Sequence, residues 1–552
     1  MPFRRTLFAA AAIAATSCAI AAHAGTVIEN VNGYTLNANN QLVRFKALAF
    51  DDKGRIVAVG SARDVEKKAK GYTRIDLQGK TMLPGLIDAH GHVFGLGSIA
   101  TSAELYSSTS LQGALDAIGK FAQANPGRAW VVGNGWNQEI WKLGRFPTAA
   151  ELDAVVADRP AVMHRVDGHA MWVNSKALEL AGIGKDTKDP AGGKIERDAN
   201  GNATGLLVDN AMEFIDKVMP PPTEAEARGM LDGALKALSS VGLTSVHDAG
   251  IDAKSDRLFR DYADHGKLTT RVYAMIMDTG ADFDQLSKNG PLKSYANDLY
   301  ALSAVKLVSD GALGSRGAAL IEPYSDDPHT RGLLFYTDGD VQQKIAKAAK
   351  AGYQVNVHAI GDAGNKQVLD GFAKLGAQPE MRHRMEHAQV VQLKDIPRFK
   401  QLGIVPSMQP THATSDQNMA EQRVGHERIK GAYAWRTFLK QGSRIACGSD
   451  FPIESPNPFQ GIHAAVTRQD MSNFPAGGWY REQAMTLQEA FRCFTIDAAW
   501  AAHQEKAIGS LETGKWADFV VTDRDLFTVP AAEIGKIGVL ETWVSGKQVY
   551  KK

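Results

Sequence analysis

Residues 83–92 read Leu83-Pro84-Gly85-Leu86-Ile87-Asp88-Ala89-His90-Gly91-His92, and this stretch decides the fold prediction for the 552-residue chain. The apolar residues from Leu86 onward predict a short buried strand that ends abruptly in two histidines. Because side chains alternate between the two faces of a strand, His90 and His92 point the same way. Two neutral imidazoles on one face can bind one metal ion. The stretch therefore predicts a strand with a candidate metal site at its carboxyl end.

Seven further apolar runs end in polar residues in the same way. They cover residues 244–248, 271–275, 303–307, 354–358, 384–387, 404–408 and 444–450. Their intervals are typical of consecutive βα units, each a strand followed by a crossover helix. Eight such units predict an α/β fold of the (β/α)8 TIM-barrel type, whose active site lies at the carboxyl ends of the strands.

The interval between the first two runs is several times longer than a barrel unit, so we predict an insertion at about residues 100–225. Strand patterns with turn signals also occur near both ends of the chain, at 44–60 and at 517–550. We therefore predict a small β-sandwich domain built from residues 25–83 and 504–552. The barrel then occupies residues 84–503.

The first 24 residues have the pattern of a signal peptide. Arg4 and Arg5 precede a short apolar stretch, and Ala22-His23-Ala24 is typical of a cleavage site. We therefore expect an exported, periplasmic protein. No later segment reaches the roughly 18 apolar residues of a membrane span. For Cys447 and Cys493 we expect two buried thiols, although export would permit a disulfide.

The composition excludes several classes of protein. The chain has 62 Lys and Arg against 61 Asp and Glu, so its charge gives no reason to expect a nucleic acid or an anionic membrane as partner. Three cysteines are too few for a disulfide scaffold or a Cys-rich zinc module, whereas 15 histidines allow a His-based metal site. The expected partner is a small molecule. The oligomeric state stays open, with a homodimer as one option.

Six polar residues stand at the predicted strand ends. They are His90, His92, Lys306, His358, His387 and Asp450. Each alone has an ordinary explanation: a strand-end histidine is often structural, a lysine is usually solvated, and an aspartate often caps a helix. Their joint placement in one inferred ring indicates a site instead.

These motifs resemble the metal-dependent amidohydrolase superfamily. Residues 83–92 are similar to its opening motif, and residues 305–316, 357–362, 385–389 and 448–452 resemble the branch that includes N-substituted formamide deformylase. The resemblance covers nearly the whole chain after residue 24. Phe451 departs from it, since the branch often has Trp there.

The resemblance implies a binuclear site, with two Zn²⁺ as the first choice and Mn²⁺, Fe²⁺ or Co²⁺ as alternatives. His90 and His92 would hold one metal, and His358 and His387 the other. Lys306 would bridge both after carboxylation of its amine, because an ammonium has no lone pair to donate. Asp450 would approach the first metal and act as the catalytic acid and base.

The implied activity is hydrolysis of a non-peptide, amide-type C–N bond in a small molecule, with N-substituted formamides as the nearest analogy. A metal-activated hydroxide would attack the carbonyl. A deaminase or cyclic amidase on the same metals is one alternative, although residues 357–360 lack the glutamate that deaminase relatives use. A non-catalytic ligand-binding protein on the same barrel is the other, and the presence of all six site residues argues against it.

The residues that select the substrate are harder to predict. The candidates are Trp136, His164 and His169 in the insertion, Arg316 and Asp362 after catalytic strands, and His412 after the seventh strand. Core packing is the alternative for Trp136, and solvated loop charge for Arg316 and Asp362. His247 and Asp248 also lie at a strand end, but the resemblance gives them no ligand role.

Overall fold

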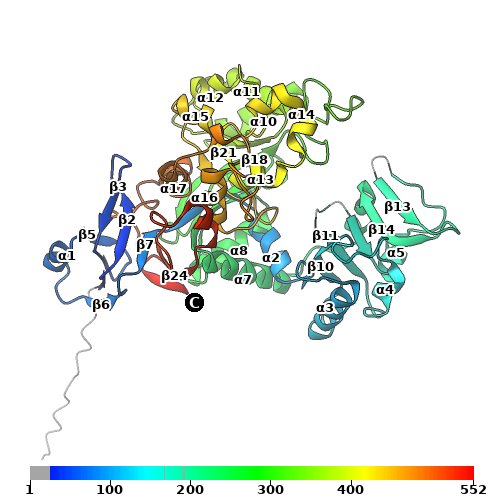
Figure 1. Cartoon of the computed structure of the whole chain (residues 1–552), viewed down its shortest axis with the longest axis horizontal. Helices are drawn as coiled ribbons and strands as arrows, with labels where there is room; N and C mark the ends of the chain where they lie inside the picture. Colours follow the sequence, from blue (N-terminus) through cyan, green and yellow to red (C-terminus); the bar gives the residue numbers. More distant parts are fainter. Residues whose placement is uncertain (1–24, 167, 169, 191–192) are drawn as a thin grey trace, which may run out of the picture.

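The largest sheet of the protein is a barrel of eight strands that pair in parallel (Figure 1). The computed structural model describes residues 25–166, 168, 170–190 and 193–552. In barrel order the strands are β8 (Leu86–Gly91), β15 (Leu243–Ile251), β16 (Arg271–Met277), β18 (Tyr300–Val308), β19 (Gln354–Ala359), β20 (Arg384–His387), β21 (Val405–Met408) and β22 (Ala446–Cys447). A ninth strand, β17 (Leu292–Tyr295), pairs antiparallel with β18 at its side. Each of the eight coincides with one of the apolar runs.

The first and last strands approach closely enough to close the barrel almost completely. The backbone N–H of Asp450 donates to the carbonyl of His90 at 2.7 Å. The Asp88 carboxylate accepts hydrogen bonds from the backbone N–H and the hydroxyl of Ser449. Gly448 permits this approach, because a Cβ there would lie 2.5 Å from the nitrogen of His90. The predicted TIM-type barrel is thus confirmed as a mostly parallel, nearly closed eight-stranded barrel.

Helices cover the outside of the barrel (Figure 1). The long ones are α7 (Glu224–Ser240), α8 (Ala253–Asp264), α10 (Asp338–Lys350), α11 (Asp362–Leu375) and α16 (Pro458–Thr467). Helix α7 begins with a capping box, in which Thr223 and Glu226 satisfy each other's backbone N–H groups. Its Leu231, Leu235 and Leu238 are buried at helical spacing and pack into the main hydrophobic core.

The chain between α2 (Val93–Ala100) and α7 forms a separate six-stranded sheet. Its order is β13 (Gly193–Arg197), β14 (Ala203–Asp209), β12 (Ala170–Val173), β11 (Ala161–Arg165), β10 (Val131–Trp136) and β9 (Ala103–Glu104). Helices α3 (Leu111–Ala124), α4 (Ala149–Asp153) and α5 (Ser175–Leu180) accompany it. Two hydrophobic clusters belong to this unit, so it has a core of its own. Figure 1 shows it beside the barrel.

Both ends of the described chain contribute strands to one further sheet. The six-stranded sheet has the order β25 (Lys547–Lys551), β24 (Val539–Val544), β23 (Phe519–Thr522), β7 (Thr81–Pro84), β2 (Asn32–Leu36) and β3 (Leu42–Phe45). A four-stranded sheet, β5 (Ile56–Gly60), β4 (Ala47–Asp51), β1 (Gly25–Glu29) and β6 (Thr73–Asp76), shares a hydrophobic cluster with it. The sandwich arrangement and the domain boundaries stay predictions.

The expectation of two buried thiols is wrong, because Cys447 and Cys493 form a disulfide. Cys447 ends β22, and Cys493 ends α17 (Leu487–Cys493). Their Cα atoms lie 5.0 Å apart, within the range that a disulfide spans. Sequence spacing did not reveal this, because the two residues meet only after the barrel has formed.

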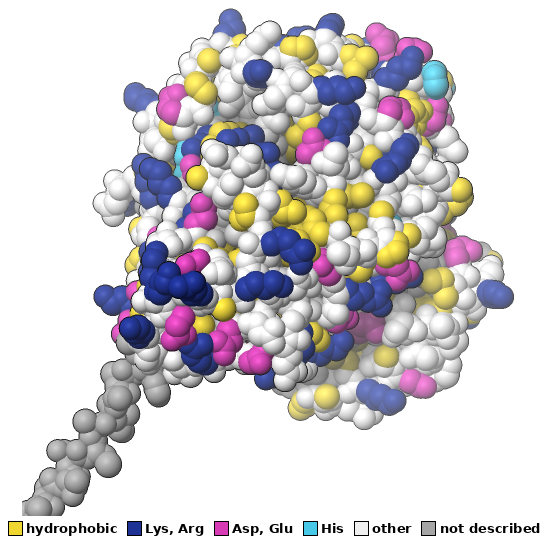
Figure 2. All heavy atoms as spheres, turned by 60° about the vertical axis from the view of Figure 1, so that its left-hand side comes forward, with side chains coloured by type: hydrophobic (Ala, Val, Ile, Leu, Met, Phe, Trp, Pro, Cys, Tyr) yellow, Lys and Arg dark blue, Asp and Glu magenta, His cyan; other side chains and the backbone are white. Residues whose placement is uncertain are grey.

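No helix in the described part of the chain combines the length and apolarity needed to cross a membrane. On the face drawn in Figure 2, basic and acidic side chains are interspersed, with hydrophobic side chains between them. This face therefore has no broad patch of one charge.

Candidate metal centre

Asp450 lies among histidines from several strand ends. Its Oδ1 is 3.1 Å from Nε2 of His92 and 3.4 Å from Nε2 of His90, and its Oδ2 is 3.4 Å from Nε2 of His412. The backbone of Asp450 has φ of 60°, a left-handed conformation that non-glycine residues adopt mainly where their surroundings impose it. Burial alone would raise the pKa of Asp450, but the neighbouring imidazoles of His412, His90 and His92 hold this pKa well below its ordinary value. The carboxylate is therefore ionised.

The other predicted site residues lie in the same cluster. Nζ of Lys306 is 3.2 Å from Nε2 of His90. The ring of His387 lies 4.8 Å from that of His90 and 4.5 Å from that of His358, centroid to centroid. His90, His387 and Asp450 each offer one ligand atom, and these atoms lie within 4.8 Å of one another. The structure thus brings together all six residues that the sequence placed at strand ends.

The free donor atoms of this cluster suit a divalent metal. Nδ1 of His387 is 2.8 Å from Oε1 of Gln409, which leaves Nε2 of His387 for a ligand. Nε2 of His358 is buried without a hydrogen-bond partner in the described residues, although Oδ1 of Asp310 lies 3.5 Å away. Burial lowers the pKa of the Lys306 amine. Imidazole nitrogens and a carboxylate are the donors that Zn²⁺ and similar ions prefer, so the residues fit such an ion.

The sequence missed the residues that hold these ligands in place. Nδ1 of His90 lies 2.5 Å from Oε2 of Glu386, which is fully buried. Such a carboxylate fixes the tautomer and orientation of a metal-binding imidazole. A signal was present, because Arg384 and Glu386 are two charges on one face of a parallel barrel strand, and such strands are normally buried on both faces.

His412 joins the cluster from α13 (Pro410–Asp416), which follows β21. Its Nδ1 lies 3.3 Å from Oε1 of Glu454, and its Nε2 faces Asp450. Burial alone would lower the pKa of His412, but its hydrogen bonds to Asp450 and Glu454 raise it to about 10. His412 therefore brings a positive charge to the site at neutral pH. It was predicted as a substrate-side residue, whereas Glu454 was missed.

Trp136 and His164 belong to the inserted unit, on strands β10 and β11. Trp136 is fully buried in the core of the inserted unit, packs against Trp141 and Trp172, and donates its ring N–H to the carbonyl of Met163. The substrate-binding prediction for Trp136 is therefore replaced by core packing. His164 lines a cavity of about 590 Å³ beside residues 220–223. His169 lies outside the described residues.

Asp362 and Arg316 each interact with another group of the protein. The buried Asp362 carboxylate accepts the backbone N–H of Ile321 at 2.9 Å and thereby fixes the loop after β18. Arg316 pairs with Asp326 at 2.9 Å. Arg316 also lines a cavity of about 710 Å³, whose other wall comes from residues 209–216 of the inserted unit. Of these two, Arg316 keeps access to a space that a small molecule can enter.

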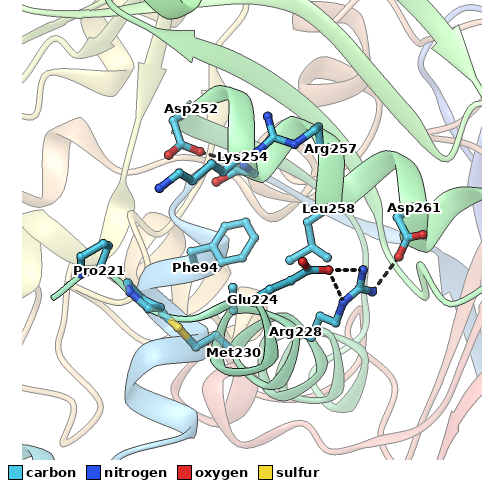
Figure 3. Close-up of a pocket in the computed structure, with 13 residues that line it drawn as sticks. Phe94, Pro221, Glu224, Arg228, Met230, Asp252, Lys254, Arg257, Leu258 and Asp261 are labelled. Atoms are coloured by element: carbon cyan, nitrogen blue, oxygen red, sulfur yellow. Dashed lines mark hydrogen bonds and ion pairs between the residues drawn. The ribbon is translucent and has the colours of Figure 1, made fainter. Parts of the chain in front are cut away.

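A different cavity, of about 640 Å³, lies between α7 and α8 (Figure 3). Phe94 and Leu258 form part of its apolar lining. Arg228 on α7 pairs with Glu224 of the same helix and with Asp261 of α8. None of the six clustered residues lines it. It is therefore separate from the candidate metal centre.

A nearly closed (β/α)8 barrel with histidines, a lysine and an aspartate at its strand ends defines a class of metal-dependent hydrolases. Residues 73–550 match the model of the amidohydrolase family, and the chain belongs to that family. The protein is accordingly a hydrolase that acts on C–N bonds other than peptide bonds, and it belongs to the metal-dependent amidohydrolase superfamily.

Relatives match along almost the whole chain. YtcJ of Bacillus subtilis (strain 168) is 33% identical and covers 92% of this chain and 96% of its own. N-substituted formamide deformylase of Arthrobacter pascens is 28% identical and covers 95% of this chain and 98% of its own. Among solved structures, a metal-dependent hydrolase from Pyrococcus horikoshii OT3 has a TM-score of 0.77 and 28% identity, covering 92% of this chain and 99% of its own.

Proposed function

We propose that the protein hydrolyses the amide-type bond of a small N-acyl or N-formyl amine. The observation that carries this proposal is the position of Asp450, which lies within 3.4 Å of both His90 and His92 at the mouth of the barrel. This position supports the ionised Asp450 carboxylate as the catalytic acid and base. The similarity to N-substituted formamide deformylase supports a formamide as one substrate.

We further propose a binuclear centre, with Zn²⁺ as the first choice and Mn²⁺, Fe²⁺ or Co²⁺ as alternatives. His90 and His92 would hold one ion, His358 and His387 the other, and Lys306 would bridge them after carboxylation. The lowered pKa of Lys306 supports this step, because only the neutral amine can react with carbon dioxide. When bound, such ions polarise a carbonyl and acidify water.

The protein's own side chains then handle protons and charge. Asp450 would accept a proton from the attacking water and deliver it to the departing nitrogen, since an amine leaves readily only once protonated. The protonated His412, 3.4 Å from Asp450, would stabilise negative charge that develops on the substrate oxygen. Glu454 would hold His412 in this orientation through its contact with Nδ1.

We also propose that the protein is exported to the periplasm. The pattern of residues 1–24, which lie outside the described residues, supports this location. The disulfide between Cys447 and Cys493 supports it as well, because disulfides persist in oxidising compartments. N-terminal sequencing of the protein from a periplasmic fraction tests this, and Gly25 is the expected first residue.

The function is tested with a panel of N-formyl and N-acyl amines. We expect hydrolysis of at least one compound, its loss after chelation, and its recovery with Zn²⁺ or Mn²⁺. Hydrolysis that survives complete metal removal would contradict the mechanism. Ligands that raise the melting temperature without being hydrolysed would instead indicate a binding protein.

A further inference from the structure

The interior of the barrel beneath the candidate metal centre contains a buried chain of polar side chains. His247 on β15, Arg384 and Glu386 on β20, and His90 on β8 all have relative exposures of 0%. Barrel interiors are usually filled by branched apolar side chains. Burying charged groups is unfavourable unless they are paired and hydrogen-bonded. Here a run of ion-pair and hydrogen-bond contacts joins these side chains, although Nε2 of His247 has no hydrogen-bond partner in the described part of the chain.

The chain starts at His90. Its Nδ1 lies 2.5 Å from Oε2 of Glu386, and its Nε2 faces Lys306 and Asp450. The carboxylate can only accept at this contact when ionised, so Nδ1 carries the proton and the lone pair of Nε2 is free. Glu386 thus sets both the tautomer and the direction of His90.

Arg384 holds Glu386 in place. Nε of Arg384 lies 2.7 Å from Oε1 of Glu386, and Nη2 lies 3.2 Å from Oε2. Nη2 also donates to the carbonyl of Ala89 and to the hydroxyl of Ser407 at 2.7 Å. The guanidinium therefore connects three strands of the barrel through fixed donor geometry.

His247 supplies the remaining contact of this guanidinium. Nη1 of Arg384 lies 3.0 Å from Nδ1 of His247. Arginine has no acceptor, so it donates, and Nδ1 of His247 must be the unprotonated nitrogen. His247 is the residue of β15 that accepts a hydrogen bond in this network. It holds Nη1 of Arg384, whereas Glu386, Ala89 and Ser407 contact Nε and Nη2.

We propose that His247 is a positioning residue for the metal centre, acting on His90 through Arg384 and Glu386. This inference rests on the proposed metal site and extends it to a residue that touches neither metal nor substrate. Its effect passes through the orientation of one ligand. Replacing His247 should therefore alter the binding of the metal and leave the contacts with the substrate unchanged.

The test compares two substitutions at one position. His247→Phe keeps the size of the ring but removes the acceptor, and we expect the dissociation constant for Zn²⁺, measured by chelator competition, to rise by about 10–100-fold. The visible absorption of bound Co²⁺ should change as well, since it reports ligand geometry. His247→Asn restores an acceptor oxygen near the position of Nδ1, and both readouts should return close to the wild type.

Tyr273→Phe serves as the matched control, because the Tyr273 ring packs 5.3 Å from that of His247 while its hydroxyl bonds only to Gln354 among the described residues. We expect it to leave metal affinity unchanged. If His247→Phe does not fold, His247→Ala takes its place. Wild-type Zn²⁺ affinity and Co²⁺ spectrum in the folded acceptor-free variant would overturn the inference, as would failure of His247→Asn to restore them. A wild-type protein that binds metal but hydrolyses nothing would overturn the proposed function alone.

Discussion

Nζ of Lys306 lies 3.2 Å from Nε2 of His90, although their strands, β18 and β8, are separated by two others in the barrel. The contact therefore crosses the interior of the barrel at the carboxyl ends of its strands. An ammonium here cannot share a metal with His90, because it has no lone pair. A carboxylated amine in the same place would offer two oxygen donors, which the proposed bridge between two ions requires.

Replacing Lys306 tests this bridge. We expect Lys306→Ala to lower the metal content from about two ions per chain to about one, and to reduce kcat by at least the ~10–100-fold that supporting residues cost. Added acetate or propionate should restore part of the activity by supplying the missing carboxylate. Lys344→Ala is the control, since this lysine pairs with Asp278 near the surface. Two ions per chain in Lys306→Ala would contradict the bridging role.

Asp450 should be essential for turnover. Asp450→Asn keeps the size of the side chain but removes the proton acceptor, so we expect kcat to fall by about 10²–10⁴-fold. The measurement is steady-state kinetics combined with elemental analysis of the same sample. Near-normal turnover in a variant that retains its metals would exclude Asp450 as the acid and base.

The disulfide should stabilise the barrel at the strand that precedes Asp450. A loop closed between Cys447 and Cys493 is expected to stabilise the fold by about 2–4 kcal/mol, because it restricts the unfolded chain. Urea unfolding of the Cys447→Ala/Cys493→Ala protein should therefore show a lower midpoint. An unchanged midpoint, with free thiols absent from the wild type, would show that the bond contributes no stability.

His383 should make stability depend on pH away from the metal centre. Burial lowers the pKa of His383 to about 4, and its Nδ1 accepts the backbone N–H of Val355 at 2.9 Å. Between pH 4 and about 6.5 the unfolded chain takes up a proton that the folded protein does not. The free energy of unfolding should therefore fall on acidification through this window, by at most ~1.4 kcal/mol per pH unit.

His383→Asn retains an acceptor without a titrating group. The free energy of unfolding of this variant, measured in urea from pH 4 to 8, should vary less with pH than that of the wild type. Identical pH dependence in the two proteins would show that the pKa of His383 does not differ between the folded and the unfolded protein.

The barrel and its ring of ligands could be predicted because their signals are local. Each strand is an apolar run, and His90, Lys306, His358 and Asp450 follow from the rule that barrel sites lie at strand carboxyl ends. The close approach of His412 and Glu454 to each other and to Asp450 could not be predicted, because it depends on how α13 and the loop after β22 fold over the mouth of the barrel.

The burial of Trp136 and the contact between His247 and Arg384 could not be predicted either, because both depend on packing between distant parts of the chain. Trp136 has the appearance of a binding residue, but only the packing of the inserted unit shows that Trp141 and Trp172 bury it. The contact between His247 and Arg384 joins two strands that are far apart in sequence. Periodicity indicates which face a side chain occupies, but it does not identify the partner across the barrel.

The metal content per chain decides whether the cluster around Asp450 is a binuclear metal centre. It should be measured by elemental analysis of the mature protein, purified without chelators and without a nickel column. We expect about two divalent ions per chain, held by the cluster around Asp450. One ion per chain would contradict the bridge at Lys306, and none after reconstitution would contradict the metal-dependent mechanism itself.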